Sequence, residues 1–232
     1  MLSQSTIKKI RSLHKKKFRK EHYEFIVEGV KAVEELLMSD YEVVAIYSAD
    51  SLQGAIQISE KELFRISALQ TPNQVLAVVK MAEFVADGTK SAIVLDGVRD
   101  PGNLGTIIRL ADWYGIEQVV CSVDSAECFN PKVVQASMGS LFRVKVTYTD
   151  LEAYLSKSKL TSFAAVMDGG AAVSTENNFN LIMGSESHGI RNSLDTLADQ
   201  RITIEKIGAA ESLNVGVATG ILLDRLLTGR KP

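Results

Sequence analysis

The sequence has few of the residues that build metal sites and disulfide frameworks. It contains two cysteines, three histidines, four prolines and one tryptophan among 232 residues. Cys121 and Cys128 lie seven positions apart, with no zinc-site pattern of cysteine or histidine around them. We therefore expect no metal in the functional site and no oxidising compartment.

Long apolar runs and a secretory leader are absent as well. No uninterrupted apolar run approaches the ~20 residues that cross a bilayer. The basic residues near the N-terminus are not followed by the apolar segment of a signal peptide. These absences predict a reduced, cytoplasmic protein that does not enter a membrane.

Acidic residues are missing from one segment, residues 8–20. Eight of the 26 basic residues lie there, which leaves 18 basic against 28 acidic residues in the rest of the chain. A basic arm on an acidic body favours a localised contact with a polyanion such as RNA, although a solvated lysine-rich helix explains the same pattern. The predicted RNA-binding residues are Lys8, Lys9, Arg11, Lys15, Lys16, Lys17, Arg19 and Lys20.

Three aromatic residues, Phe18, Tyr23 and Phe25, lie in or beside this arm. Aromatic rings stack on the bases of single-stranded RNA. The same rings also suit the apolar side of a helix that packs inward. Both interpretations stay open at the level of sequence.

Apolar periodicity and turn residues divide the chain into two α/β domains joined by a linker. Residues 1–80 predict a small domain with strands at 24–29, 42–47 and 75–79, and residues 81–91 form the linker. Residues 92–232 alternate strands and helices, which is typical of a mostly parallel sheet with helices on both faces. The expected strands are 92–96, 118–121, 142–147, 162–166, 181–183 and 201–204, and the expected helices are 104–114, 131–138, 151–156 and 192–197.

Three loops of the second domain carry polar residues beside buried elements. Residues 95–109 follow a buried strand and open a helix, where Asn103 suits an N-cap and Arg109 lies off the apolar stripe. Their glycines do not have the Gly-x-Gly-x-x-Gly spacing, so no nicotinamide cofactor is inferred. In residues 181–190 a strand runs directly into Glu186, which serves a site at the strand end or caps the next helix.

The third loop leads into a long apolar helix near the C-terminus. Ser212 and Asn214 stand at its start, and Gly216 and Gly220 allow another helix to approach closely. A simple helix cap explains Asn214 by itself. The other two loops favour a site.

The three loops as an ordered set resemble the SpoU (TrmH-type) family of RNA ribose 2′-O-methyltransferases, in the SPOUT superfamily. The matching motifs are Asn-x-Gly-x-x-x-Arg from Asn103, Gly-Ser-Glu-x-x-Gly-Ile from Gly184 and Ser-Leu-Asn-Val from Ser212. The resemblance covers residues 92–228. Residues 1–80 are similar to the small ribosomal-protein-like substrate-binding domain that many members carry.

The resemblance implies an α/β fold with a deep trefoil knot, a homodimer, and S-adenosylmethionine as cofactor. By this resemblance the catalytic residues are Asn103, Arg109, Glu186, Ser212 and Asn214. The cofactor is expected around Met183, Gly184, Ile204, Ile207 and Leu213. Two positions depart from the family pattern: Gly216 replaces a small hydroxyl residue and Glu205 replaces a proline.

Arg109 presents a mechanistic choice, because a guanidinium stays protonated in proteins and makes a poor general base. We expect it to clamp a neighbouring phosphate and to stabilise the developing alkoxide. His188 has a suitable titration range for a base, but a solvated loop histidine is the simpler interpretation.

Two rival functions are consistent with the same sequence. One is a catalytically idle RNA-binding or ribosome-assembly factor with this fold, and the other is a small-molecule nucleotide-binding enzyme that does not need the basic arm. The added N-terminal domain favours ribosomal RNA over transfer RNA as the substrate. The modified nucleotide is not encoded in any motif.

Overall fold

The computed structural model describes residues 1–172 and 174–228. The described chain forms two compact units. The first comprises Met1–Ala82 together with Glu127–Arg143, and the second comprises the remainder. The division expected from sequence placed residues 127–143 in the second domain, whereas the structure groups them with the first.

The first unit is built on a four-stranded sheet in the order β1-β4-β2-β3. β4 pairs antiparallel with β1 and β2, while β3 pairs parallel with β2. The elements are α1 (Gln4–Ser12), α2 (Lys16–His22), β1 (Glu24–Glu28), α3 (Val30–Leu37), β2 (Val43–Ser48), β3 (Ile56–Gln57), α4 (Glu60–Ile66), β4 (Val75–Lys80), α6 (Pro131–Ser137) and the 3-10 helix η1 (Ser140–Phe142).

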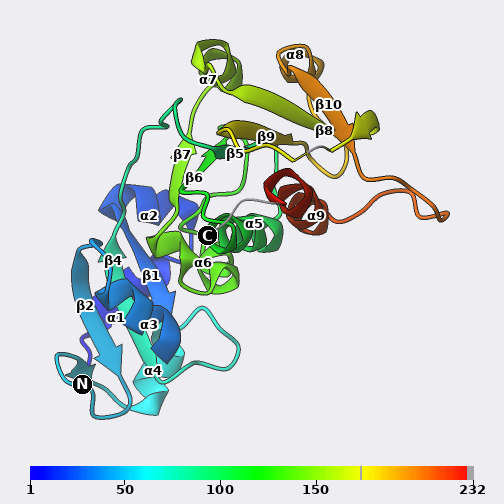
Figure 1. Ribbon diagram of the computed structural model, residues 1–232. Coiled ribbons are helices and arrows are strands. Elements are labelled where there is room, and N and C mark those ends of the chain that lie inside the picture. Colours follow the sequence, from blue (N-terminus) through cyan, green and yellow to red (C-terminus); the bar gives the residue numbers. More distant parts are fainter. Residues whose placement is uncertain (173, 229–232) are drawn as a thin grey trace. The chain divides into compact units, whose positions relative to one another are not determined.

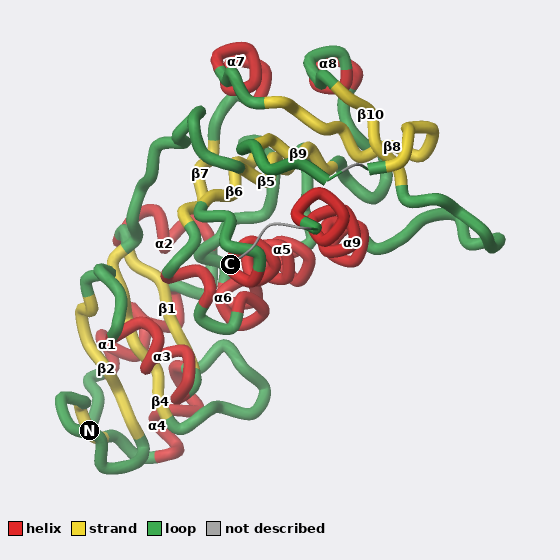
Figure 2. The backbone as a smooth tube through the Cα atoms, viewed as in Figure 1, coloured by secondary structure: helices red, strands yellow, loops and turns green. Residues whose placement is uncertain are grey.

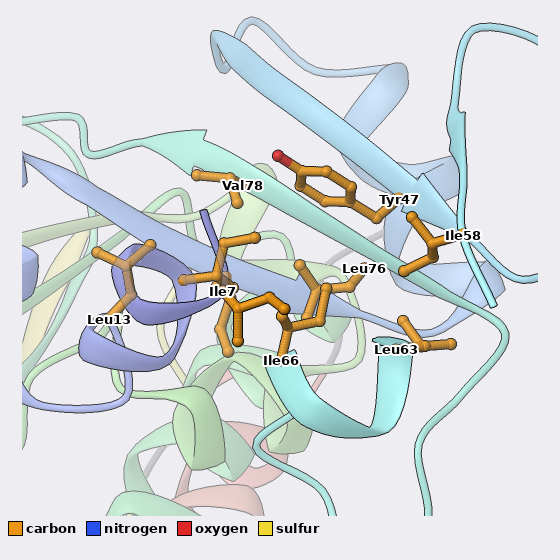
Figure 3. Packing of buried hydrophobic residues seen from close by; sticks show 10 residues of the cluster. Ile7, Leu13, Tyr47, Ile58, Leu63, Ile66, Leu76 and Val78 are labelled. Atoms are coloured by element: carbon orange, nitrogen blue, oxygen red, sulfur yellow. The ribbon is translucent and has the colours of Figure 1, made fainter. Parts of the chain in front are cut away.

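One face of this sheet is covered by α1 and α4 (Figure 3). Ile7 and Leu13 meet Ile66 and Leu76 there, and all four side chains are at most 3% exposed. Side chains alternate between the two faces of a strand, so Ile26 of β1 joins this core and Phe25 points the other way. Burial of these apolar side chains is the main source of the unit's stability.

The other face explains why residues 127–143 join the first unit. The ring of Phe25 lies 4.6 Å from that of Phe129, and Tyr41 contacts both Phe25 and Phe142. Phe142 therefore ends η1 rather than beginning the strand expected at 142–147, and β7 starts at Lys145. Apolar periodicity within a short segment does not reveal that Phe129 packs against Phe25 of β1, far earlier in the chain.

The second unit is a six-stranded sheet in the order β10-β8-β9-β5-β6-β7, in which every named pair is parallel. This confirms the mostly parallel α/β fold expected from sequence. Its elements are β5 (Ala92–Leu95), α5 (Pro101–Trp113), β6 (Gln118–Cys121), β7 (Lys145–Tyr148), α7 (Leu151–Lys157), β8 (Thr161–Ala171), β9 (Phe179–Met183), α8 (Asn192–Asp195), β10 (Gln200–Thr203) and α9 (Val215–Leu227).

Helices cover both faces of this sheet (Figure 1). α7 and α8 pack over Ala92, Val94, Val120 and Ile182 on one face. α5 and α9 lie side by side on the other, and the tube view shows the long loop that leads from β10 into α9 (Figure 2). Within the described residues, no helix combines the length and apolar character that crossing a membrane requires.

Candidate functional site

Strand pairing brings two of the three predicted loops together. β5 and β9 are parallel neighbours, with Leu95 opposite Met183. The backbone N–H of Asp96 continues the ladder by donating to the Met183 carbonyl at 2.9 Å. The loops that follow these two strands therefore begin at the same edge of the sheet. This edge, at the carboxyl ends of the strands, is where such folds usually bind ligands.

The loop after β9 closes into a tight turn, here called the Glu186 turn (residues 184–189). Ser185 and Gly189 exchange backbone hydrogen bonds of 3.0 and 2.9 Å. Gly189 has φ +66°, and a Cβ on Gly184 would collide with the backbone of Gly189 and Ile190. Glycine at both ends is thus a geometric requirement of the turn.

Three predicted residues meet in a closed hydrogen-bonded set, here called the Asn–Glu–Asn triangle. Asn103 Nδ2 donates to Glu186 Oε1 at 2.8 Å. Asn214 Nδ2 donates to Asn103 Oδ1 at 2.8 Å and to Glu186 Oε1 at 3.2 Å. Each of the three loops contributes one side chain, so the triangle joins the starts of α5 and α9 to the Glu186 turn.

Asn103 does not cap α5, contrary to the sequence expectation. The helix begins earlier, at Pro101, and Asp100 is its N-cap, whose carboxylate accepts the Asn103 N–H at 2.8 Å. Proline suits the first helical position because it has no N–H to leave unpaired. The Asn103 side chain is therefore available for the triangle.

Asn214 combines the two roles that the sequence left as alternatives. Its Oδ1 caps α9 by accepting from the N–H groups of Gly216 and Val217, at 3.0 and 3.3 Å. Its Nδ2 remains for the triangle. Gly216 allows this arrangement, because a Cβ there would lie 3.1 Å from Thr106 Cγ2 and 3.2 Å from Asn214 Oδ1.

A cavity of about 580 Å³ lies on one side of the Glu186 turn. All five residues predicted for the cofactor line it, as do Glu186 and Ser212; those five are Met183, Gly184, Ile204, Ile207 and Leu213. The loop between β10 and α9 supplies much of one wall and is exposed, with Ile207 at 96% and Leu213 at 47%.

A second cavity of about 300 Å³ lies on the other side of the same turn. It shares Ser185, Glu186, His188, Gly189 and Val215 with the first cavity. Its remaining lining comes from the loop after β5, from Asn103 in the first turn of α5 and from three further positions; the set is Asp96, Gly97, Val98, Arg99, Asp100, Asn103, Asp124, Ser187 and Arg191. The Glu186 turn therefore lines both cavities, and the place where they adjoin at this turn is here called the partition.

Sequence reasoning missed the charged residues of this smaller cavity. Asp96 and Arg191 form an ion pair, and so do Arg99 and Asp124. Hydrogen bonds from Arg99 and then Ser122 hold the pKa of Asp124 below its usual value. One signal was available, because Asp96 directly follows a fully buried apolar strand and a carboxylate there needs a partner.

Arg109 lies apart from the triangle. It is an exposed residue of α5, six positions after Asn103, which places the two side chains about 120° apart around the helix. Among the described residues that line the two cavities, Arg109 does not occur. Ser212 is exposed at the wall of the larger cavity.

The basic arm forms two helices, α1 and α2, separated by a turn at residues 13–15. Seven of its eight cations are exposed; these are Lys8, Lys9, Arg11, Lys15, Lys16, Lys17 and Lys20. Among the aromatic residues, Phe25 packs inward, Phe18 is half-buried and Tyr23 is 40% exposed.

Arg19 is the exception, and its prediction as an RNA contact is wrong. Its side chain is buried, with the residue 1% exposed, and pairs with Glu127 at 2.5 Å. A further guanidinium nitrogen donates to the Leu13 carbonyl at 2.8 Å. Charge pattern alone does not separate a cation that faces solvent from one that anchors a helix.

Comparison with known families covers both units. The model of the SpoU rRNA Methylase family matches residues 90–224, and that of the MRM3-like substrate binding domain matches residues 4–77. A Bacillus subtilis relative named 23S rRNA (guanosine(2553)-2′-O)-methyltransferase RlmP is 33% identical over 235 residues, which cover 95% of each chain.

Two solved structures share the fold across nearly the whole chain. One, from Porphyromonas gingivalis and assigned to the TrmH family of RNA methyltransferases, has a TM-score of 0.87 at 36% identity and covers 98% of each chain. An AdoMet-bound rRNA methyltransferase from Sinorhizobium meliloti has a TM-score of 0.87 at 27% identity, covering 97% of this chain and 95% of that one.

These matches confirm the resemblance drawn from the three motifs, and with it S-adenosylmethionine as the cofactor of the family. The chain belongs to the SpoU (TrmH-type) family of RNA ribose 2′-O-methyltransferases.

Proposed function

We propose that this protein methylates a ribose 2′-hydroxyl of ribosomal RNA, with the larger cavity holding S-adenosylmethionine and the smaller cavity receiving the target ribose. The observation that carries the proposal is the Asn–Glu–Asn triangle, which joins all three family motifs at the partition between the cavities. Reacting groups on the two sides of this partition would be held close together, and alignment of that kind contributes roughly 7–11 kcal/mol to catalysis.

The larger cavity fits the cofactor in size and in chemistry. Its volume falls in the ordinary range for ligand sites, roughly 300–1,000 Å³. Apolar side chains such as Ile204, Ile207 and Leu213 suit an adenine ring. Carboxylates exceed cations in the lining, which suits a sulfonium and an ammonium group; they are Asp168, Glu186, Asp195, Glu205 and Glu211 against Arg201 and Lys206.

The triangle's task is to position the reacting oxygen. When bound, S-adenosylmethionine supplies an electrophilic methyl carbon. Glu186 orients the amide groups of Asn103 and Asn214, so that these polar side chains are preorganised before RNA binds. Ser212, at the rim, orients the loop that precedes α9.

Arg109 acts by clamping a phosphate next to the target nucleotide and by stabilising charge on the 2′-oxygen. Its exposed position 120° from Asn103 supports delivery to the site of a partner subunit. Trp113, one turn further along α5, is 82% exposed, and Val217 on α9 is 53% exposed. This apolar face supports a homodimer formed through α5 and α9.

Substitution of Arg109→Ala tests this role. Removing one charge-stabilising donor costs about 10²–10³ in rate, so methyl transfer should fall by that factor. Cofactor affinity measured by calorimetry should stay within about threefold. Lys157→Ala, an exposed cation on α7, is the control and should transfer at the normal rate. A normal rate in Arg109→Ala removes this residue from the mechanism.

The first unit serves as the RNA-binding domain, with residues 1–80 as its core. The match to a substrate binding domain and the exposed cations of α1 and α2 support this assignment. Ribosomal RNA is favoured because the related enzymes are named for 23S ribosomal RNA, and their guanosines are the first targets to test. Activity on this substrate supports a cytoplasmic location.

The trefoil knot is part of the same proposal. The N–H of Thr175 donates to the carbonyl of Leu226 at 2.9 Å, so the end of α9 lies beside the connection between β8 and β9. That proximity supports a C-terminal segment threaded through a loop of the second unit.

Mapping of ribose methylation across ribosomal RNA, with and without the gene, tests the function. We expect one 2′-O-methyl group to disappear on deletion and to return with the wild-type gene but not with Asn103→Ala. An unchanged map, together with RNA binding by the purified protein, would favour the idle assembly factor.

A further inference from the structure

A buried aspartate binds the chain on both sides of the Glu186 turn, through its backbone on one side and its carboxylate on the other. Asp96 is 3% exposed and lies at the end of β5. Its backbone N–H holds the carbonyl of Met183, the residue before the turn, at 2.9 Å. Its Oδ2 accepts the backbone N–H of Arg191, two residues after the turn, at 2.7 Å.

The side chain of Arg191 also binds the Asp96 carboxylate. Its Nε and one terminal nitrogen each lie 2.6 Å from Asp96 Oδ1, so a single carboxylate binds both the backbone and the guanidinium of one residue. Two nitrogens of one planar guanidinium thus share a single carboxylate oxygen, an arrangement that the compact ammonium of lysine does not reproduce. The hydrogen bond that Arg191 donates to Asp96 also raises the pKa of the guanidinium above its usual value.

Few other contacts among the described residues fix the Glu186 turn in place. Ser187, His188 and Gly189 are exposed, and Glu186 is exposed as well. The hydrogen bonds between Ser185 and Gly189 set the shape of the turn, but they do not attach it to the sheet. Attachment therefore depends on Asp96, on the strand β9, on the triangle that Glu186 makes, and on Ile190, which packs against the core under α7 and α8.

We propose that Asp96 and Arg191 are positioning residues for methyl transfer, which fix the Glu186 turn between the two cavities. The proposal rests on the proposed function of Glu186. Neither residue belongs to the set expected from the family motifs. Loss of the pair leaves the strands intact but lets the turn, and Glu186 with it, move away from Asn103 and Asn214.

The test compares Arg191→Met and Arg191→Lys with Lys90→Met, which removes the Lys90–Glu117 pair of the same unit outside both cavities. Two quantities are measured. Amide hydrogen exchange at position 191, whose N–H donates to Asp96, reports attachment of the turn, and the single-turnover transfer rate at saturating cofactor and RNA reports catalysis.

In Arg191→Met we expect exchange at the position-191 amide to rise at least tenfold and the transfer rate to fall at least tenfold. Arg191→Lys should lie between this variant and the wild type, and Lys90→Met should match the wild type. Wild-type exchange at position 191 in Arg191→Met would overturn the proposal, as would an unchanged rate at saturation.

If Arg191→Met does not fold, Arg191→Lys decides the question, and wild-type values for both quantities would overturn the proposal. If the wild-type protein transfers no methyl group, the proposed function fails, whereas the exchange comparison still decides whether the pair fixes the turn.

Discussion

At the scale of single residues, the site depends on side chains that serve local structure and function together. Asn214 caps α9 through Oδ1 and joins the triangle through Nδ2. Its capping role is predictable from sequence, because asparagine before an apolar helix is a common N-cap. Its bond to Asn103 spans 111 residues and depends on tertiary structure, so only the family resemblance pointed to it.

Arg19 shows the opposite case, a residue whose charge pattern pointed to RNA although its side chain is a structural anchor. Removing one partner of a buried ion pair costs about 3–5 kcal/mol, so Arg19→Met should lower the free energy of unfolding by that amount. Lys16→Ala, on the exposed surface of α2, should leave stability unchanged.

The same two variants separate structure from RNA contact. In Lys16→Ala the slope of RNA affinity against salt concentration should fall by about 1, as expected for one lost phosphate contact. Thermal unfolding and filter binding at several salt concentrations measure the two effects. Unchanged stability in Arg19→Met would contradict the anchoring role.

At the scale of elements, the site depends on which strands are neighbours. A continuous apolar run predicted β5, because parallel strands covered on both faces are continuously apolar. The position of β9 between β8 and β5 was not predictable, since strand order depends on crossovers rather than on local pattern. That order is what brings Asn103 to Glu186.

Gly184 is the position in the Glu186 turn where an added side chain would disturb the site. Because a Cβ there collides with backbone, Gly184→Ala should open the Glu186 turn and cost about 1–3 kcal/mol of stability. Cofactor affinity should fall as well, since the turn lines the larger cavity. Calorimetric titration and thermal unfolding measure both.

Gly88→Ala is the matched control, because a Cβ at Gly88 meets its nearest atom at 3.9 Å. It should bind cofactor and unfold like the wild type. Equal behaviour of the two alanine variants would mean that the turn tolerates a side chain.

At the scale of the whole molecule, sequence predicted two α/β parts but not the path of the chain through them. Residues 127–143 join the first unit because the rings of Phe129 and Phe142 pack with Phe25 and Tyr41. Assembly is a further level, and the homodimer proposed above rests on the exposed positions of Trp113 and Arg109.

Mixing two inactive variants tests that assembly. If Arg109 serves the partner's site, heterodimers of Arg109→Ala and Glu186→Gln contain one intact site. Random exchange of subunits makes half of the dimers mixed, so about a quarter of the wild-type activity should return. No recovery after verified exchange would place Arg109 in its own subunit's site.

We propose that the triangle of Asn103, Glu186 and Asn214 positions the ribose 2′-oxygen for methylation. The most direct measurement is transfer of labelled methyl from S-adenosylmethionine to ribosomal RNA, followed by digestion to nucleosides, for the wild type and Asn103→Ala. Alanine suits the start of α5, so the variant should keep its fold. We expect label on a 2′-oxygen with the wild type, and we expect the transfer rate of Asn103→Ala to be at least ~100-fold lower than that of the wild type. Label on a base, or equal rates for the two proteins, would contradict it.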